Sequence, residues 1–313
     1  DFSEEELSYL SLLSTCLAYM DTDHYSFQDL NAEIYLHSGG FGADLSAYNN
    51  FKEKNHYTGV FSAGFKFMEG EMEKGLEYLA EILFHTHLTD EKRLSEILLE
   101  VKSRERMRME GAGHHYAVNR AMESFSPSAY YQERVKGIRY YHFIEKLEKD
   151  FRKNPKALGE KLSSLAKKLF RGKNLRCTIG GDLILYRKER ERLSAFLAQY
   201  FPEKEEWEES IFTEKKGMKE AWITPSEVNY VARVGMIHDK VFPFTGALKV
   251  LKNALSFDFL WKNIREKGNA YGVMSGFGRT GECYVVSYRD PHVGRSMEVY
   301  KKIPDYVRAF EAT

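Results

Sequence analysis

The sequence predicts an α+β fold of two related α/β-sandwich domains, each a mainly antiparallel sheet covered by helices. Segments with apolar residues every three to four positions alternate with shorter runs of strand-like alternation. The order helix, glycine-containing corner, two strands and helix occurs twice, which indicates a divergent internal repeat. Between the two copies, residues 202–217 are charged and poor in aliphatic residues, as linkers are. We therefore expect a first unit over 1–210 and a second, incomplete unit over 213–313.

The first unit is expected to begin with two helices. Leu7, Leu10, Leu13 and Leu17 share one face of 4–20, and 25–40 ends in glycines that favour a helix C-terminus. Strand-like alternation and helical periodicity then follow in turn. The expected strands are 41–48, 57–68 and 174–182, and the expected helices are 72–86, 89–110, about 114–170 with breaks at 126–127 and 154–155, and 185–201.

The second unit repeats the scheme with a strand at 221–237 and a helix at 242–268. A hairpin of 270–278 and 283–290 follows, and then a helix at 292–310. The hairpin contains GFGRTG at 276–281, which has the letters of the dinucleotide-binding fingerprint. That fingerprint needs a helix after it, whereas a strand follows here, so we expect a hairpin turn and no nucleotide.

The composition excludes several classes of partner. Lys+Arg and Asp+Glu are 46 each, so no net field favours nucleic acid or an anionic membrane. No run of 18 apolar residues is present, so we expect no membrane partner. Three scattered cysteines favour a reducing, cytoplasmic location, with an organelle as the open alternative. The acidic opening lacks signal-peptide features, and we expect that the true N-terminus is missing.

The ten histidines do not form a recognisable zinc motif. Neither HExxH nor HxxEH occurs, and either would place two imidazoles and a catalytic carboxylate on one helix face. His85 and His87 with Glu81, and the pair His114 and His115, are more typical of surface residues. A GxSxG nucleophile motif is also absent from the sequence. We expect no metal ligands and no complete catalytic machinery in this chain.

Arg265 and Tyr271 lie on either side of a Gly-Asn turn, where the expected helix meets the expected hairpin. In the structural interpretation, the arginine complements the helix dipole and the tyrosine packs against a neighbouring strand. In the functional interpretation, both side chains donate hydrogen bonds to a carbonyl oxygen or to the oxyanion that develops from it. The spacing by itself leaves both interpretations open.

The segment around these two residues resembles the presequence-protease-like enzymes, a branch of the pitrilysin/insulinase superfamily of inverted zincins. Their signature there is approximately R-x-x-G-G-A-Y-G, a strand, and then S-Y-R-D-P. Arg265, Gly268 and 270–272 fit the first part and 287–291 fit the second, whereas Asn269 replaces the second glycine. The segments 7–40 and 113–121 are also similar to that family.

This resemblance implies a C-terminal half of a zinc metalloendopeptidase that degrades unstructured oligopeptides inside a clamshell chamber. Zinc and its HxxEH motif would belong to the N-terminal half of the same polypeptide. When the expected helix 4–20 is overlaid on the metal-bearing helix of that family, Leu12, Thr15 and Cys16 occupy the positions of the two histidines and the glutamate. These three residues cannot replace the zinc ligands and the general base. Arg265 and Tyr271 would be the catalytic and substrate-binding residues. The alternative is a non-catalytic structural or peptide-binding subunit of the same superfamily.

Overall fold

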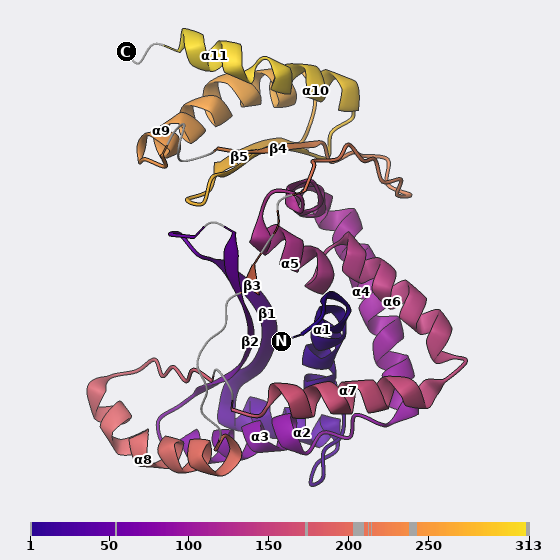
Figure 1. The fold of residues 1–313 in the computed structure, drawn as a ribbon, viewed down its shortest axis with the longest axis vertical. Coiled ribbons are helices and arrows are strands. Elements are labelled where there is room, and N and C mark those ends of the chain that lie inside the picture. The colour runs from indigo at the N-terminus through magenta and orange to yellow at the C-terminus, as the bar shows by residue number, and fades with distance from the viewer. Residues whose placement is uncertain are drawn as a thin grey trace. The chain divides into compact units, whose positions relative to one another are not determined.

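The structure, a computed structural model, describes residues 2–53, 55–172, 175–202, 210–211, 213, 215–237 and 243–310. It is rich in helices and contains two small sheets, which confirms the α+β class (Figure 1). The strands are β1 Ser38–Asn49, β2 His56–Phe67, β3 Ser210–Ile211, β4 Ala232–Met236, β5 Gly272–Phe277 and β6 Glu282–Tyr288. The helices are α1 Glu4–Tyr19, α2 Phe27–His37, α3 Met72–Phe84, α4 Glu91–Met122, α5 Pro127–Val135, α6 Ile138–Phe151, α7 Pro155–Leu169, α8 Leu183–Tyr200, α9 Ala247–Ala254, the π-helix η1 Leu255–Glu266, α10 Val293–Lys301 and α11 Ile303–Ala309.

The chain divides into two compact units, and each is made of three separate segments. Unit 1 comprises Asp1–Ser46, Gly59–Lys102 and His142–Glu209. Unit 2 comprises Ala47–Thr58, Ser103–Tyr141 and Ser210–Thr313. The expected domains over 1–210 and 213–313, separated at a charged linker, stay a prediction.

Unit 1 is organised around α1. Ser3 caps this helix and forms a capping box with Glu6, which satisfies backbone groups at the helix N-terminus. Leu12 and Leu13 on α1 are fully buried, and α1 contacts α2, α3 and α7. The helical periodicity of 4–20 therefore predicted an interior helix correctly.

Two expected strands differ from the structure. Residues 175–182 contain no strand, so the prediction over 174–182 is wrong for its described part. No described strand forms a hydrogen-bonded ladder with this segment, and alternation alone does not hold an extended chain in place. The strand expected at 221–237 is limited to β4, because Pro225 lacks a backbone donor and Asn229 forms only an isolated bridge with Asp290.

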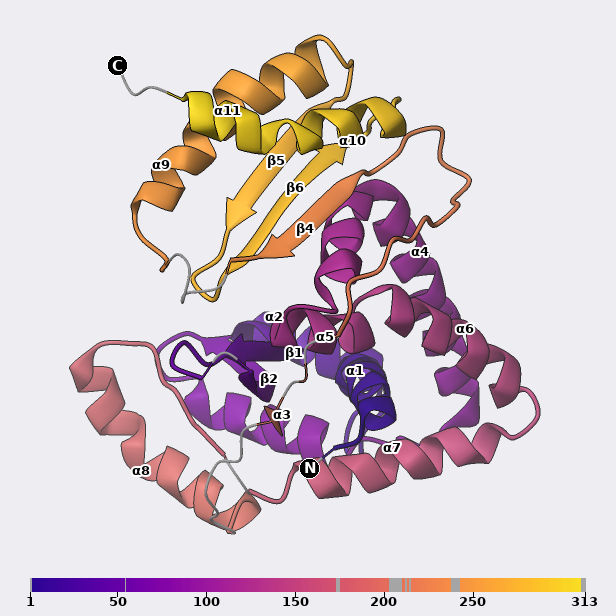
Figure 2. The same ribbon diagram turned by 45° about the horizontal axis from the view of Figure 1, so that its top comes forward.

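Unit 2 contains the antiparallel sheet β4-β6-β5. Figure 2 shows α9, η1, α10 and α11 stacked over one face of this sheet. The core between these layers includes Leu260 and Ile264 from η1, Val273 and Val285 from the sheet, and Tyr300 from α10. Because side chains alternate along a strand, Met274, Tyr284, Val286 and Tyr288 belong to the opposite face, which we call the open face.

The hairpin between β5 and β6 confirms the interpretation of GFGRTG as a turn. Phe277 pairs with Cys283 at the end of the ladder, and Gly281 adopts a φ of 102°. A Cβ at Gly281 would lie 2.3 Å from the Ile237 carbonyl oxygen, so only glycine fits there.

No helix in the described part of the chain is long and apolar enough to span a bilayer.

Candidate functional site

The corner between η1 and β5 has a strained backbone. The Lys267 amide donates to the Lys262 carbonyl at 3.2 Å, which continues the wide π-type winding to the end of the helix. A Cβ at Gly268 would lie 2.4 Å from the Ile264 carbonyl oxygen. Asn269 then adopts a left-handed φ of 60°, a conformation that only glycine, asparagine and aspartate visit readily. Strained backbone of this kind is often found at functional sites.

The corner brings Arg265 and Tyr271 together. The Arg265 guanidinium carbon lies 4.0 Å from the centre of the Trp261 ring and 5.9 Å from the centre of the Tyr271 ring. Both residues are exposed, and 66% of the Tyr271 surface is accessible. The two side chains that the sequence singled out are thus neighbours and open to a ligand, while their catalytic role stays a prediction.

Tyr288, at the end of β6, supports Tyr271. Its ring centre lies 5.7 Å from that of Tyr271, at an interplanar angle of 70°. The Tyr271 amide donates to the carbonyl of Arg289, which has a left-handed φ of 47°. The buried Asp290 carboxylate accepts from the His292 amide and the Ser296 hydroxyl, which fixes the turn after β6. These bonds give the S-Y-R-D-P segment a structural role.

A kink in α4 places a second group of residues against the open face. Ala112 departs from helical geometry, with φ −127° and ψ 32°. The Tyr230 hydroxyl donates to the Glu110 carbonyl oxygen at 2.6 Å, so it satisfies an acceptor beside the kink. A Cβ at Gly113 would lie 2.2 Å from the Tyr230 ring, so this close approach requires glycine.

The kink brings His114 to Tyr288. The two ring centres lie 4.8 Å apart in an edge-to-face arrangement, and the His115 ring centre lies 4.0 Å from that of His114. Burial, reinforced by the neighbouring His115, lowers the pKa of His114, so its imidazole is neutral at pH 7. The His114 Nδ1 atom is buried and has no hydrogen-bond partner among the described residues.

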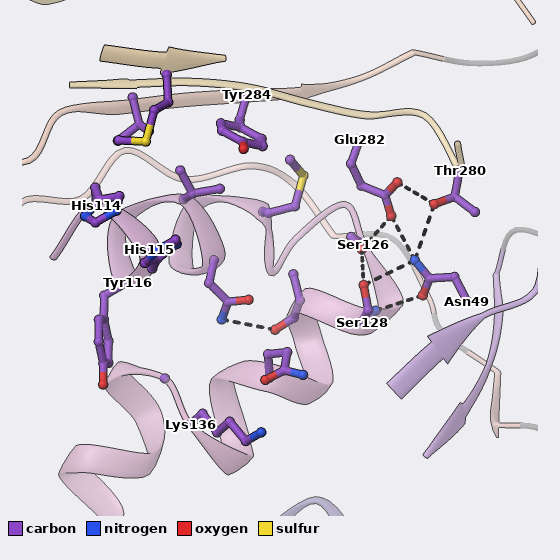
Figure 3. A pocket seen from close by; sticks show the side chains of 18 of the residues that line it. Asn49, His114, His115, Tyr116, Ser126, Ser128, Lys136, Thr280, Glu282 and Tyr284 are labelled. Carbon is purple, nitrogen blue, oxygen red and sulfur yellow. Dashed lines mark hydrogen bonds between the residues drawn. The ribbon is translucent and has the colours of Figure 1, made fainter. Parts of the chain in front are cut away.

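A cavity of about 700 Å³ lies between the open face and the helices α4 and α5, as Figure 3 shows. Its polar end is centred on the Glu282 carboxylate, which accepts from Asn49 Nδ2 and Ser126 Oγ at 2.9 Å each and from the Thr280 hydroxyl. These bonds tie the end of β1, the start of α5 and the β5–β6 turn together inside unit 2. The carboxylate therefore accepts hydrogen bonds from three neutral donors.

Comparisons with known proteins fit this geometry. Residues 1–147 match a family model described as "Peptidase M16C associated", and residues 219–313 match one described as "PreP C-terminal domain". The chain belongs to the pitrilysin family of peptidases. The resemblance to presequence-protease-like pitrilysins, predicted from the motifs, is confirmed, as is the assignment to a C-terminal half.

Several known proteins match almost the whole chain. Protein HypA of Clostridium perfringens is 30% identical over 316 residues, covering 99% of this chain and 31% of that protein. Presequence protease 1 of Arabidopsis thaliana is 23% identical over 312 residues, covering 98% of this chain and 28% of that protein. The mitochondrial presequence protease of Saccharomyces cerevisiae is 23% identical over 318 residues, covering 97% and 32%. The chain thus spans about a third of the length of these relatives.

A solved structure supports the fold. The periplasmic protease PqqL from Escherichia coli matches with a TM-score of 0.52 and 12% identity, covering 98% of this chain and 32% of that one. At this identity the match shows the fold alone and leaves the chemistry to the site itself.

The zinc that pitrilysins use does not fit the residues described here. Leu12 and Cys16 are fully buried in unit 1, and burial raises the pKa of the Cys16 thiol to about 12, which disfavours a thiolate ligand. Asp23 hydrogen-bonds His85 Nδ1 at 2.9 Å and His87 Nε2 at 2.8 Å on the surface. Across the described ranges, no group of three or more His, Cys, Asp or Glu residues could hold a metal ion.

Sequence reasoning missed the residues that surround the pair. Tyr230, Tyr288 and His114 are distant in the sequence and carry no motif that links them. A signal for the kink was present, because Gly111 and Gly113 flank Ala112 inside a long helical pattern. The tyrosine hydroxyls that use the carbonyls beside the kink could be found only from the structure.

Proposed function

We propose that this chain is the substrate-binding, C-terminal half of a zinc-dependent metalloendopeptidase that degrades unstructured oligopeptides inside a clamshell chamber. The support is the juxtaposition of Arg265 and Tyr271, both exposed, on a chain of the pitrilysin family. Relatives named presequence proteases support a peptide substrate. The N-terminal half of the same polypeptide would carry HxxEH and its zinc, which activates water for attack on the peptide.

In this proposal, Arg265 binds the peptide and Tyr271 stabilises the transition state. The permanently charged guanidinium holds a backbone carbonyl of the substrate. The Tyr271 hydroxyl donates to the oxygen that becomes negative when the tetrahedral intermediate forms. The Trp261 and Tyr288 rings hold the two donors before substrate arrives, so little reorganisation is needed during the reaction.

The test is the Tyr271→Phe substitution in the full-length protein, with an unstructured peptide as substrate. We expect kcat to fall by about two to three orders of magnitude with little change in KM, because the lost hydrogen bond strengthens in the transition state. Arg265→Ala should both lower kcat and raise KM. Tyr35→Phe, at a tyrosine of unit 1 that is 78% exposed, is the matched control. Wild-type turnover in both site variants would show that the pair is structural.

The 313-residue chain by itself should neither bind zinc nor cleave peptides. Hydrolysis of an unstructured peptide by the purified chain with zinc would contradict this assignment of roles. The alternative of a non-catalytic subunit is tested by the sequence upstream of Asp1 in the gene. A long preceding segment with HxxEH supports the peptidase, and a start codon directly before Asp1 supports the subunit.

A further inference from the structure

The cavity on the open face has an apolar wall that the protein leaves uncovered. Met274 and Tyr284 from the sheet are only half-buried, as is Val118 from α4 on the facing wall. Apolar side chains inside a unit are normally packed to high density, so an uncovered apolar wall indicates room for a ligand of the same character.

The backbone of β5 keeps this space open. Gly276 pairs with Tyr284 across the ladder, and a Cβ at Gly276 would lie 2.4 Å from the Tyr284 ring. The Tyr284 ring therefore lies over Gly276, and a larger residue at position 276 would displace it. The open volume is thus a consequence of a specific glycine.

Two charged groups of the cavity, Glu282 and Arg108, bond to other side chains of the protein, and a third, Lys136, is exposed. Glu282 accepts bonds from three neutral donors, as described above, and Arg108 pairs with Glu105 at 2.8 Å. The uncovered apolar part of the wall is formed by Met274, Tyr284 and Val118. This wall suits an apolar side chain of a peptide, because such a side chain fills the space and covers the apolar surface.

The cavity lies close to the candidate catalytic pair. The Tyr288 ring centre lies 5.7 Å from that of Tyr271 and 4.8 Å from that of His114, a residue of the cavity wall. These two ring-to-ring steps span at most about three residues of an extended peptide. A peptide whose carbonyl reaches Tyr271 can therefore place a nearby side chain in the cavity.

We propose that this cavity is a peptide subsite that receives one large apolar side chain, within about three residues of the cleaved bond. The inference rests on the proposed function of Arg265 and Tyr271. It adds a specificity pocket, built by the open face and α4, to that function. Met274, Tyr284 and Val118 contact the bound side chain.

The experiment uses the full-length protein and peptides with one cleavable bond, scanned with Ala, Leu, Phe or Trp at each position within three residues of it. We expect one position where Phe raises kcat/KM at least tenfold over Ala, as apolar pockets typically do. Met274→Trp fills the cavity and should reduce this preference to less than threefold. Val118→Phe fills it from the opposite wall and should act in the same direction.

Met68→Trp, at a methionine of unit 1 that is 79% exposed, is the matched control and should keep the wild-type preference. A preference that survives both filling substitutions, or no size preference at any scanned position, would overturn the subsite. These outcomes are distinct from failure of the proposed function, which is judged by Tyr271→Phe on the Ala peptide. If that variant loses turnover while the filling variants retain the Phe preference, only the subsite is wrong.

Discussion

The Arg265 guanidinium lies 4.0 Å from the centre of the Trp261 ring, about one helical turn earlier in η1. An arginine over an indole gains a cation–π attraction and loses rotational freedom, so the guanidinium is preorganised toward Tyr271. The position of Arg265 therefore depends on Trp261, which lies outside the R-x-x-G-G-A-Y-G signature.

Replacing Trp261 should weaken catalysis by the full-length protein without removing any donor. Trp261→Leu removes the aromatic face, and we expect kcat/KM to fall about three- to thirtyfold, because such a contact contributes about 0.5–2 kcal/mol. Trp261→Phe keeps an aromatic face and should restore most of the loss. Phe257→Leu, on an exposed residue of η1, is the control in steady-state kinetics. Equal losses for Trp261→Leu and Trp261→Phe would contradict the cation–π role.

The left-handed backbone at Asn269 predicts an asymmetric response to substitution. Asn269→Ala should reduce the free energy of unfolding by about 1–2 kcal/mol, because a Cβ without a compensating polar group is unfavourable at a φ of 60°. Asn269→Gly should be neutral or stabilising. Urea denaturation of the 313-residue chain measures both, with Glu266→Ala as an exposed control in η1. A loss for glycine equal to that for alanine would show that strain is not the cause.

The two glycines that flank Ala112 should respond in opposite directions. A Cβ at Gly113 would meet the Tyr230 ring at 2.2 Å, so Gly113→Ala should destabilise the chain by about 1–3 kcal/mol. A Cβ at Gly111 has no atom within 4 Å, and Gly111→Ala should stabilise the helix by up to about 1 kcal/mol. Thermal unfolding compares the pair directly. Destabilisation by Gly111→Ala would mean that the kink itself needs glycine there.

The capping box of α1 predicts a pH-dependent stability. The bond from the Ser3 amide, assisted by Lys161 and Lys168, lowers the pKa of Glu6 to about 2 from an ordinary value of 4.5. A lowered carboxyl pKa stabilises the fold above pH 4.5, and this stabilisation is lost as the pH falls toward 2.

Glu6→Gln should therefore lower Tm at pH 7, and its difference from wild type should disappear between pH 4.5 and 2. The effect at pH 7 should be about 1 kcal/mol, because the group is partly solvated. Glu5→Gln, in the same exposed first turn, is the control. A difference in Tm between Glu6→Gln and wild type that stays constant across this pH range would contradict the role of the charge.

Much of the fold follows from local sequence. The spacing of leucines in 4–20 predicted α1, and the breaks at 126–127 and 154–155 coincide with the starts of α5 and α7. The hairpin of β5 and β6 was predictable because alternation and a glycine-rich turn are both local features. The segment 175–182 was mispredicted because a strand needs a partner, and no local pattern supplies one.

The sequence by itself determined the helices, the hairpin and the corner that carries Arg265 and Tyr271, because periodicity and turn chemistry act over a few residues. Tertiary structure alone decided the wide winding of η1 and the neighbours of the pair. The Tyr288 hydroxyl donates to the Gly111 carbonyl oxygen across 177 positions of sequence. Such a contact exists only once the open face packs against α4, so it depends on the shape of both surfaces.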